Sequence, residues 1–480
     1  MPKVLVANRG EIAIRIFKTA RKKGWACVAV YSDADRDSLH LEYADEAYYI
    51  GSSPATESYL NIPAILKAAK DSNAGYIHPG YGFLSEKAEF AQAVADAGIQ
   101  FIGPTPAAML KLGSKISAKQ LAKELGIPLV PGNHLAIKDH KQALQIARDT
   151  GIPLIIKAAA GGGGKGMRVV RNFDEIEEAI GLARAEALAS FGDDSLFIEK
   201  FIENPRHIEV QIMADQHGHC VYFPDRECSI QRRYQKLMEE SPCNFIPEKV
   251  KQSMYSDALN LAKASGYTNT GTVEFIIDND GNYYFLEMNT RLQVEHTVTE
   301  MLTGLDLVDM QLDVALGHEL PLKQEEINAT GHAMQWRIYA ENPMQNFAPS
   351  TGTITHYHAP ELRDIRIDSG YTVGKAVSIY YDPMIAKLLS RAAHRTDCIE
   401  KLKQALSQFD IRGIETSIPF GIKLLQHPDL LEGNLSTGFL DQHLDEILNP
   451  ADSLEKHLAI AAAAYFHYQN KSSILQLPKS

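Results

Sequence analysis

Two glutamates that could hold a divalent cation flank a predicted turn in the second half of the chain. Glu274 and Glu287 lie on either side of Asp280-Gly281, and Asp-Gly between two apolar runs is a strong signal for a two-residue hairpin turn. Counting outward from that turn places Glu274 opposite Glu287, where two like charges destabilise the strand pair. We therefore expect a cation between the carboxylates, and hard oxygen ligands beside phosphates favour Mg²⁺.

A row of polar residues continues the second strand of this hairpin. Glu287, Asn289, Arg291, Gln293 and Glu295 occupy alternate positions, and an extended backbone places alternate side chains on one face. Such a row would suit a small anionic reactant held beside a metal-bound phosphate. An exposed antiparallel strand with a polar outer face gives the same alternation and is the ordinary explanation, but it leaves the facing glutamates unexplained.

A glycine-rich segment upstream could bind phosphate groups. An apolar run that ends at Lys157 is followed by glycines at 161–164, then Lys165 and Gly166. Glycine lets backbone N–H groups approach an anion, although a flexible hairpin tip would also use glycine. The Walker A pattern is absent because Gly166 stands where it requires Ser or Thr. The segment therefore predicts a lid over a nucleotide, and Lys115 is a further candidate for phosphate contact.

Two other segments carry polar groups that could reach the same ligand. Residues 197–202 form a strand-like run with Glu199 and Lys200 inside it, and residues 227–236 are dense in hydrogen-bond donors. A solvated basic stretch is the ordinary explanation of such a run. Its closeness in sequence to the predicted hairpin favours anion binding instead.

The order of strand-like and helix-like segments predicts the elements that position these residues. Residues 1–102 alternate strand-like and helix-like runs, which predicts a parallel sheet covered by helices. The first turn is not GxGxxG, so dinucleotide binding is weakly supported. We predict an α/β and α+β multidomain protein with domains at 1–112, 113–330 (with a lid subdomain at about 132–203) and 331–440, followed by a helical tail at 441–480.

The composition limits the class of protein and of partner. The chain has 480 residues, 45% of them hydrophobic and 22% charged, as in ordinary soluble globular proteins. A formal net charge of −12 argues against nucleic acid or an anionic membrane as the main partner. Five widely spaced cysteines without a CxxC motif fit a reducing compartment. No apolar run approaches the ~18 residues of a membrane span, so we predict a cytoplasmic protein.

Five motifs together resemble the biotin carboxylase component of biotin-dependent carboxylases, an ATP-grasp family. They are Ala-Asn-Arg-Gly-Glu-Ile-Ala at 7–13, His-Pro-Gly-Tyr-Gly-Phe-Leu-Ser-Glu at 78–86, the glycine loop, Glu-Met-Asn-Thr-Arg-Leu-Gln-Val-Glu-His at 287–296 and Tyr-Asp-Pro-Met-Ile-Ala-Lys at 381–387. The resemblance covers nearly the whole chain, and the motifs at 78–86 and 287–296 are the most specific. It implies a Rossmann-like N-terminal parallel sheet, ATP-grasp central domains with a mobile glycine-rich lid, and a C-terminal mixed α+β domain.

The resemblance also implies a reaction and a set of site residues. ATP, with Mg²⁺ or Mn²⁺, would activate bicarbonate as carboxyphosphate, and CO₂ would pass to N1 of biotin. ATP would be bound by Lys115, Lys157, Gly163, Gly164, Glu199, Lys200, Ile202, His207, Gln231, Tyr234, Glu274 and Glu287, and the metal by Glu274, Glu287 and Asn289. Bicarbonate would be bound by Lys236, Arg291, Gln293 and Val294. The catalytic residues would be Arg291, Glu295, Arg337 and Lys236, with Glu295 as general base and Arg337 stabilising the biotin enolate.

The chain departs from the family pattern at two places. Tyr234 stands where many members have His, which puts that nucleotide contact in doubt. Met334-Gln335-Trp336 precedes Arg337 where many relatives have Val-Glu-Cys, so we expect different packing around an arginine that keeps its role.

Partners and alternatives follow from what the sequence lacks and from its last segment. No Met-Lys-Met biotin-attachment tripeptide occurs, so biotin is expected on a separate carboxyl carrier protein or domain, with a carboxyltransferase subunit. The family resemblance also implies a homodimer. The Ala-rich stretch near 457–468 resembles the start of the extra region of methylcrotonyl- and propionyl-CoA type α subunits, so the chain could be a truncated α subunit. The final acceptor, an acyl-CoA or pyruvate, stays open. The alternatives are another ATP-grasp ligase, of carboxylate–amine or carbamoyl-phosphate type, and a catalytically weak scaffold subunit.

Overall fold

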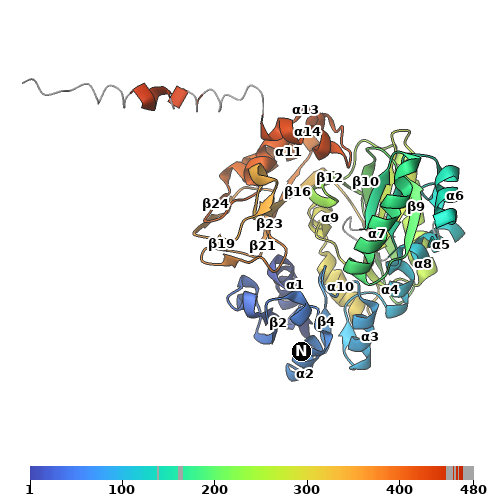
Figure 1. Ribbon diagram of the computed structural model, residues 1–480. Coiled ribbons are helices and arrows are strands. Elements are labelled where there is room, and N and C mark those ends of the chain that lie inside the picture. The colour runs from blue at the N-terminus through green and yellow to red at the C-terminus, as the bar shows by residue number, and fades with distance from the viewer. Residues whose placement is uncertain are drawn as a thin grey trace, which may run out of the picture.

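A computed structural model describes residues 1–133, 135–137, 140–159, 166–449, 458, 461–462 and 464–468 (Figure 1). The N-terminal elements lie at the bottom of Figure 1, the lid elements at the right, and the C-terminal elements at the left and top. Gly163 and Gly164 lie outside the described residues, as does most of the predicted C-terminal tail, so these predictions stay predictions.

The N-terminal part is a parallel sheet, as the alternation of strand-like and helix-like runs predicted. Its strand order is β3-β2-β1-β4-β5, and each neighbouring pair is parallel. The strands are β1 (Lys3–Val6), β2 (Ala26–Ser32), β3 (Glu46–Gly51), β4 (Tyr76–His78) and β5 (Gln100–Phe101), and the helices are α1 (Gly10–Lys22), α2 (Ile62–Asp71) and α3 (Ala88–Asp96). Val4, Leu5 and Val6 are fully buried, as expected of a strand covered on both faces.

Asn8 joins two of the sequence motifs at the carboxyl end of this sheet. Its side-chain amide donates hydrogen bonds to the carbonyl oxygens of Pro79 and Tyr81, both at 2.8 Å. The turn after β1 and the loop after β4 are therefore fastened to each other. This edge of a parallel sheet is where α/β folds carry their ligands.

The predicted lid subdomain contains its own four-stranded sheet, in the order β6-β9-β7-β8. The strands are β6 (Gly132–Asn133), β7 (Leu154–Ala158), β8 (Met167–Val170) and β9 (Leu196–Lys200), and they pack against α6 (His140–Thr150) and α7 (Ile176–Phe191). β7 and β8 pair antiparallel, with Leu154 opposite Val170, so antiparallel strands lie on either side of the glycine loop.

A nine-stranded sheet forms the centre of the molecule and continues across residue 330 into the C-terminal part. Its order is β15-β14-β10-β12-β13-β16-β23-β21, with β11 paired to β10, and its described pairs are antiparallel. The strands are β10 (Arg206–Ala214), β11 (Cys220–Tyr222), β12 (Arg226–Arg232), β13 (Gln235–Ser241), β14 (Asn269–Ile277), β15 (Tyr283–Asn289), β16 (His332–Tyr339), β21 (Ile365–Ser369) and β23 (Met384–Ala392). β13 pairs directly with β16, so side chains from both sides of the predicted boundary share one sheet face.

The remaining elements surround this sheet. The helices are α4 (Pro106–Gly113), α5 (Lys115–Glu124), α8 (Glu248–Ser265), α9 (His296–Thr303), α10 (Leu307–Ala315), α11 (Arg395–Gln408), α12 (Ile418–Leu424), α13 (Pro428–Glu432) and α14 (Phe439–Leu448). The short strands are β17 (Glu341–Asn342), β18 (Ala348–Pro349), β19 (Gly352–Thr353), β20 (His356–His358), β22 (Ala376–Val377) and β24 (Asp410–Arg412). Among the described helices, none combines the length and apolar character needed to cross a bilayer.

The hairpin β14–β15 confirms one prediction and corrects another. Glu274 does lie opposite Glu287. The two-residue turn at Asp280-Gly281 is wrong, because the last strand pair is Ile277 with Tyr283 and residues 278–282 form the connection. The Asp278 carboxylate closes that longer connection by accepting hydrogen bonds from backbone N–H groups at 280 and 282.

A β-bulge explains why the glutamates still face each other. Phe275 pairs with Phe285, but Glu274 pairs with Glu287, so Leu286 is an extra residue on the second strand. A bulge of this kind shifts the register by one residue and leaves the inserted residue unpaired. The shift cancels the error made by counting from a shorter turn.

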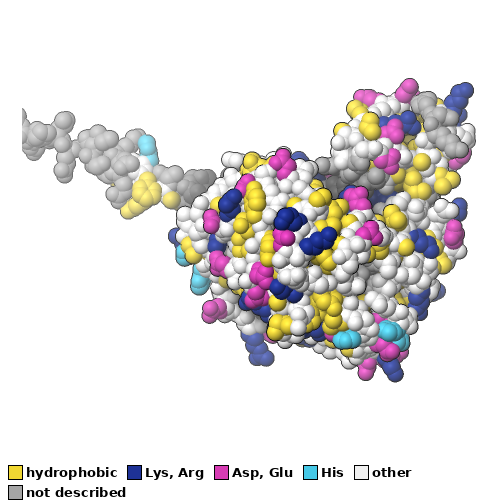
Figure 2. Space-filling view, turned by 90° about the horizontal axis from the view of Figure 1, so that it is seen from below, with side chains coloured by type: hydrophobic (Ala, Val, Ile, Leu, Met, Phe, Trp, Pro, Cys, Tyr) yellow, Lys and Arg dark blue, Asp and Glu magenta, His cyan; other side chains and the backbone are white. Residues whose placement is uncertain are grey.

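Both signs of charge are mixed over the surface shown in Figure 2, with apolar side chains between them. That face carries no single large basic area among its described residues. The charged residues that the sequence analysis singled out lie mainly in an internal cavity, which is described next.

Candidate active site

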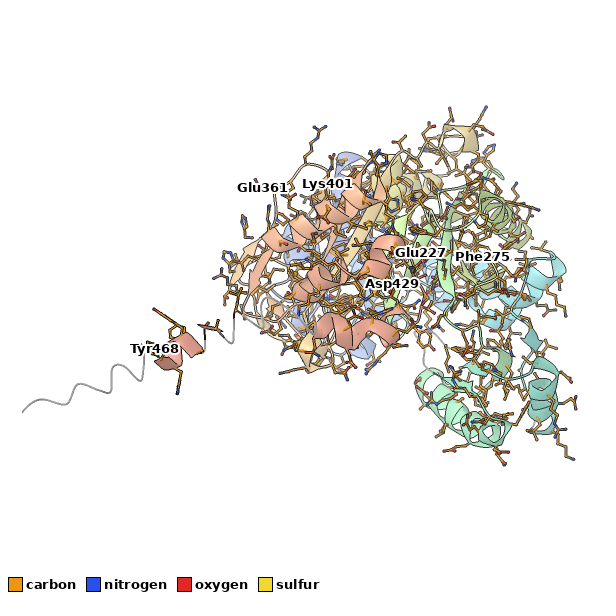
Figure 3. The ribbon with its side chains drawn as sticks, turned by 90° about the horizontal axis from the view of Figure 1, so that it is seen from above. Glu227, Phe275, Glu361, Lys401, Asp429 and Tyr468 are labelled. Atoms are coloured by element: carbon orange, nitrogen blue, oxygen red, sulfur yellow. The ribbon has the colours of Figure 1, made fainter. Side chains whose placement is uncertain are left out.

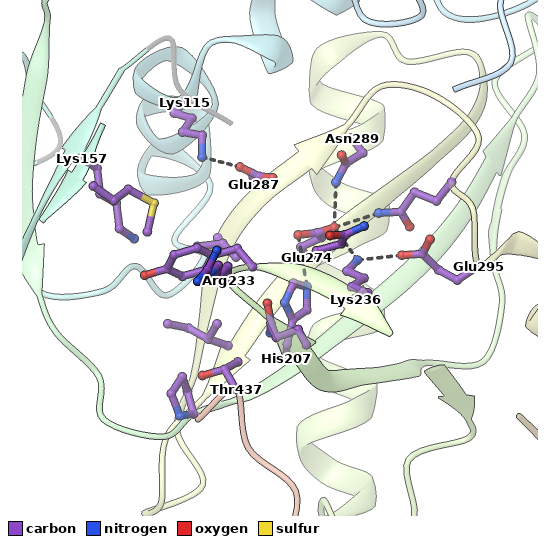
Figure 4. A pocket seen from close by; sticks show the side chains of 18 of the residues that line it. Lys115, Lys157, His207, Arg233, Lys236, Glu274, Glu287, Asn289, Glu295 and Thr437 are labelled. Atoms are coloured by element: carbon purple, nitrogen blue, oxygen red, sulfur yellow. Dashed lines mark hydrogen bonds and ion pairs between the residues drawn. The ribbon is translucent and has the colours of Figure 1, made fainter. Parts of the chain in front are cut away.

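One cavity of about 610 Å³ brings most of the predicted site residues together. Its floor is the central sheet, and one wall is the lid sheet (Figure 4). The predicted residues that line it are Lys115, Lys157, Lys200, Ile202, His207, Gln231, Tyr234, Lys236, Glu274, Glu287, Asn289, Arg291, Gln293, Val294, Glu295 and Arg337. Glu199 does not line the cavity, and the glycine loop contributes no described residue between 160 and 165.

Glu274 is the centre of a hydrogen-bond network on the cavity floor. Its Oε1 accepts from Lys236 Nζ at 3.0 Å, Asn289 Nδ2 at 2.9 Å and Gln293 Nε2 at 2.8 Å. Its Oε2 lies 3.1 Å from His207 Nε2. Burial raises the pKa of Glu274, but Lys236 and His207 outweigh burial and hold it well below its usual range. Glu274 is therefore an ionised carboxylate poised among donors.

Glu287 has its own cationic partner. Lys115 Nζ lies 2.7 Å from Glu287 Oε2, and the lysine is the first residue of α5, at the edge of the cavity (Figure 4). Burial lowers the pKa of Lys115, but Glu287 and Glu274 raise it above the usual value, so the ammonium stays charged. Lysine ammonium groups thus neutralise both facing glutamates. The repulsion between the glutamates does not by itself require a metal ion.

Lys236 holds three carboxylates at once. Its Nζ lies 2.7 Å from Glu209, 3.0 Å from Glu274 and 2.7 Å from Glu295. Burial lowers the pKa of Lys236, but these carboxylates together raise it well above its ordinary value. The side chain is consequently a fixed positive charge and not a proton acceptor.

Glu295 lies between two cations. Its Oε1 accepts from Lys236, and its Oε2 accepts from Arg337 Nη2 at 3.0 Å. Burial raises the pKa of Glu295, but Lys236 and Arg337 more than reverse that effect and leave it far below the usual value. The carboxylate is ionised, as a residue that accepts a proton must be.

Arg337 is oriented by a second glutamate that sequence reasoning did not single out. Its Nε donates to Glu239 Oε1 at 2.6 Å. Trp336 and Met334 on the same strand are fully buried in the hydrophobic core, which accounts for the apolar residues at these family-variant positions. Strand β16 thus places the Arg337 guanidinium on the cavity side, while Trp336 and Met334 pack into the hydrophobic core on its other face.

Arg291 connects the hairpin to the N-terminal part of the chain. Its Nη2 donates to Asn289 Oδ1 at 2.9 Å, and its Nε lies 3.0 Å from Glu86 Oε2. Glu86 ends the motif at 78–86, so the motif was recognised but this contact was not foreseen.

The polar row continues along the cavity although its strand does not. β15 ends at Asn289, and residues 290–295 bend and turn before α9 begins. The prediction that the segment stays extended is therefore wrong beyond Asn289. Arg291, Gln293 and Glu295 nevertheless line the same cavity. The turn brings Glu295 back towards Lys236, which a straight strand would carry away.

Glu199 is paired with Lys119 and Lys157 and does not line the cavity. It is fully buried and forms ion pairs with Lys119 and with Lys157, the latter at 2.9 Å. Burial lowers the pKa of Lys119 to about 8, although Glu199 opposes the shift. Lys119 was missed, but it follows Lys115 by one helical turn and shares its face of α5. That spacing was the signal that could have found it.

Tyr234 occupies a tight turn at the cavity mouth. It and Arg233 have φ values of 66° and 50°, and the turn connects Arg232 to its strand partner Gln235. The side chain is 52% exposed, and burial raises the pKa of its phenol above the usual value. The position therefore offers an uncharged hydroxyl to a ligand.

Comparison with known proteins assigns all three parts of the chain. Residues 1–109 match the family model of the biotin carboxylase N-terminal domain, residues 114–323 that of the carbamoyl-phosphate synthase L chain ATP-binding domain, and residues 335–442 that of the biotin carboxylase C-terminal domain. A biotin carboxylase of Halalkalibacterium halodurans is 49% identical over 92% of this chain and 98% of its own length. The mitochondrial methylcrotonoyl-CoA carboxylase subunit alpha of mouse is 47% identical over 96% of this chain, which spans 64% of that subunit.

Solved structures agree with this assignment. The Campylobacter jejuni biotin carboxylase–β,γ-ATP complex superposes with a TM-score of 0.90 and 45% identity, covering 92% of this chain and 98% of that one. The biotin carboxylase domain dimer of Hydrogenobacter thermophilus 2-oxoglutarate carboxylase, in complex with MgADP, ADP and bicarbonate, gives a TM-score of 0.91 and 41% identity, covering 94% and 99%. The predicted fold class is confirmed.

Proposed function

The chain belongs to the biotin carboxylase family, and we propose from this premise that its central cavity carries out the ATP-dependent carboxylation of biotin by bicarbonate through carboxyphosphate. One observation carries the proposal. The ionised Glu295 lies between Lys236 and Arg337 in the cavity that Lys115 and Lys157 also line. Phosphate-binding cations, a base and an anion-stabilising guanidinium thus share one enclosed space.

The nucleotide would lie between the lid sheet and the hairpin. Lys115 and Lys157 supply positive charge for its phosphates, and Lys200, Ile202 and Thr437 also line the cavity. Since Lys115 is paired with Glu287 when no phosphate competes, we propose that it moves to the phosphates on binding and releases that carboxylate. The Lys115 ammonium would then pair with Glu287 before the nucleotide binds and with the phosphates afterwards.

The residues present fit a divalent cation. Glu274, Glu287 and Asn289 offer carboxylate and amide oxygens on neighbouring positions of two paired strands, the donor set that Mg²⁺ or Mn²⁺ prefers. A bound ion would supply charge compensation for the transferred phosphoryl group. The Hydrogenobacter structure named above contains MgADP, which supports this proposal for the present chain.

Bicarbonate would bind at the turn after β15. Arg291 and Gln293 offer donors there, and the fixed charge of Lys236 attracts the anion. Bicarbonate is a poor nucleophile until it loses its proton, and Glu295 is the ionised carboxylate in reach of that position. Lys236 and Arg337, already paired with Glu295, keep the base ionised until the proton arrives.

Biotin would enter beside Arg337. The ureido nitrogen is weakly acidic, so a cation next to the oxygen that gains charge lowers the barrier to its deprotonation. Glu239 contacts Nε and Nη2 of the guanidinium, and Nη2 also donates to Glu295, so the two glutamates fix the arginine beside the cavity. The enolate-stabilising role rests on this orientation.

One assay tests the proposal. Purified protein with Mg-ATP and bicarbonate should hydrolyse ATP, and added free biotin should yield carboxybiotin. The second candidate, another ATP-grasp ligase, is favoured only by the name of the central family model, that of carbamoyl-phosphate synthase. If added biotin leaves the rate of ATP hydrolysis unchanged and no carboxybiotin forms, the result would support the other ATP-grasp ligase and contradict our proposal.

Partners and location extend the proposal. The mouse relative is named as a subunit of methylcrotonoyl-CoA carboxylase, and a Ruegeria pomeroyi relative as the alpha chain of propionyl-CoA carboxylase. We propose that this chain likewise works with a biotin carboxyl carrier protein or domain and a carboxyltransferase, as a homodimer in the cytoplasm. Co-purification from the native source, probed with streptavidin, would identify the carrier and, through the carboxyltransferase, the final acceptor.

A further inference from the structure

Two histidines and two acidic residues that do not line the cavity converge where the C-terminal helices α13 and α14 meet. His427 precedes α13, Asp429 lies in its first turn, and His443 and Glu446 lie on α14. The ligand atoms of His427, Asp429 and His443 lie within 4.8 Å of one another. Figure 3 shows Asp429 within this C-terminal group of helices. Nothing in the reaction proposed above uses these residues.

We infer that His427, His443 and Asp429 form a binding site for a zinc-class transition-metal ion. Asp429 Oδ2 lies 3.5 Å from His443 Nε2 and 3.9 Å from His427 Nδ1. Ligand atoms of a tetrahedral zinc site are about 3.3–3.5 Å apart, given metal–ligand bonds of about 2.0–2.2 Å. The two separations from Asp429 therefore need only a small closure, and the two imidazole donors lie within 4.8 Å of each other. Two imidazoles with one carboxylate are a zinc-type donor set, whereas Mg²⁺ prefers oxygen alone.

A hydrogen bond to His427 shows which of its ring nitrogens lacks a proton. The backbone N–H of Asp429 donates to His427 Nδ1 at 3.3 Å, so Nδ1 carries the lone pair, and a metal ion would have to displace this long hydrogen bond. The proton is then on Nε2, and that atom is buried without a hydrogen-bond partner among the described residues. The whole side chain is only 7% exposed. A buried imidazole with an unused N–H is costly unless something compensates it.

Glu446 faces both rings from the far side, at ion-pair distance and beyond hydrogen-bond distance. Its Oε2 lies 3.7 Å from His427 Nε2 and 3.8 Å from His443 Nδ1, the two ring nitrogens that would not contact the metal. Metal-bound histidines commonly donate their second N–H to a carboxylate, which fixes the tautomer and strengthens the ligand. One carboxylate thus faces the ligand edge of both rings, and a second carboxylate faces the opposite edge.

Packing holds the donors in place without a metal. Phe439 is buried, and its ring lies 5.2 Å from that of His427 and 4.8 Å from that of His443, centroid to centroid. The second carboxylate oxygen of Asp429, Oδ1, accepts from Asn434 Nδ2 at 3.2 Å. Ordinary core packing explains the ring stack. It does not explain why two carboxylates lie on its opposite edges.

The ion would close the base of the loop at 433–438. This loop is fastened to the central sheet, because Arg206 Nη2 donates to the Gly433 carbonyl at 2.6 Å and Thr437 N donates to the Pro205 carbonyl at 2.9 Å. Thr437 also lines the nucleotide cavity. A metal between α13 and α14 would thus brace one wall of that cavity from behind, without contacting any ligand in it.

Metal binding to the intact, untagged protein tests the inference directly. Protein stripped with a chelator is titrated with Zn²⁺ by calorimetry, and with Co²⁺ by visible absorption, in excess Mg²⁺ to occupy oxygen-rich sites. We expect one tight Zn²⁺ site that His443→Gln abolishes. His356→Gln is the matched control, because His356 also faces a carboxylate, Asp410 at 3.4 Å, with no third ligand described. Equal Zn²⁺ binding by wild type and His443→Gln would overturn the inference.

Glu446→Gln separates a metal site from a merely structural cluster. Glu446 is exposed and is not a ligand, so the variant should fold normally and bind Zn²⁺ about 10–100-fold more weakly. It also keeps the test usable if His443→Gln does not fold, as circular dichroism would reveal. Zn²⁺ should in addition slow amide exchange in residues 427–443 of the wild type alone. Unchanged Zn²⁺ affinity in Glu446→Gln would contradict the proposed arrangement. None of these readouts depends on ATP or biotin.

Discussion

Glu295 and Arg337 are joined by a hydrogen bond of 3.0 Å between Oε2 and Nη2, although they come from a turn before α9 and from strand β16. The proposed base and the proposed enolate stabiliser therefore neutralise each other while no reactant is present. A substrate anion that binds Arg337 would weaken this bond and make Glu295 more basic. The two groups are coupled through one contact.

Replacement of Arg337 by Ala should impair carboxylation of biotin more than bicarbonate-dependent ATP cleavage. The guanidinium acts on the biotin oxygen, and its loss is expected to cost about 10²–10³-fold in carboxybiotin formation. Parallel assays of carboxybiotin and phosphate release measure the two effects. Arg412→Ala, at an exposed ion pair, is the control and should alter neither rate. Equal loss of both activities would count against the enolate role.

Replacement of Lys236 by Met should destabilise the protein by about 3–5 kcal/mol, because three carboxylates lose a shared buried cation. Denaturant unfolding measures this change. Lys67→Met, at an exposed helical pair, should stay within about 0.5 kcal/mol of wild type. A stable Lys236→Met protein would show that the network is held by other contacts.

Replacement of Glu287 by Gln should raise the Mg²⁺ concentration needed for half-maximal ATP cleavage by at least about 10-fold, since a neutral amide is a weaker ligand for a hard cation. A Mg²⁺ titration of ATPase activity measures the shift. The isosteric control is Glu203→Gln, at an exposed pair with Arg171. Near-normal turnover of Glu287→Gln at low Mg²⁺ would refute the metal assignment.

The pH dependence of stability should depend on Glu240. Its carboxylate accepts from His332 Nε2 at 2.7 Å and from Arg395 Nε at 2.7 Å. Burial raises its pKa, but these partners lower it from 4.5 to about 2. Because the folded-state pKa is the lower one, the contribution is fully present above about pH 4.5 and is lost as the pH falls towards 2.

Glu240→Gln should therefore remove up to about 3 kcal/mol of stability at pH 7, from 1.36 kcal/mol per pKa unit. It should also flatten the stability curve between pH 4.5 and 2. Urea unfolding at a series of pH values gives both numbers, with Glu400→Gln as the exposed control. An unchanged slope in this window would mean that other carboxylates govern acid unfolding.

Replacement of Tyr234 by His should change the KM for ATP by about 2-fold or less, because both side chains can donate a hydrogen bond from this half-exposed position at the cavity mouth. Steady-state kinetics over a range of ATP concentrations measures it. A large change in kcat would show that Tyr234 acts on the reacting groups and not at the cavity mouth.

The pairing of Glu274 with Glu287 could be predicted from sequence, but the argument that their repulsion requires a metal ion was wrong. Like charges opposite each other suggested a cation, whereas Lys115 and Lys236 come from distant segments that local counting cannot bring near. The turn length was misjudged because the Asp278 carboxylate, and not an Asp-Gly type turn, closes the connection. The register survived only because Leu286 is a bulge, which leaves no mark in the hydrophobic pattern.

Residues inside the network were harder to foresee than residues in motifs. Glu209, Glu239 and Lys119 are fully buried charges, and burial of a charge can be known only once its partner is placed. Glu86 belonged to a recognised motif, yet its contact with Arg291 spans two parts of the fold. The parallel N-terminal sheet was predictable because alternating strand and helix patterns are local properties of the chain.

The bulge at Leu286 separates the solvent-exposed turn of the hairpin from the end that carries Glu274, Glu287 and Asn289. We expect residues 278–282 to tolerate the gain or loss of a residue, since they only close a solvent-exposed connection. Loss of Leu286 itself would remove the bulge and leave a regular ladder in which Glu287 still lies opposite Glu274, because Phe285 already pairs with Phe275. Insertions and deletions in this hairpin should therefore be tolerated at its tip and at Leu286, and should stop short of Glu287.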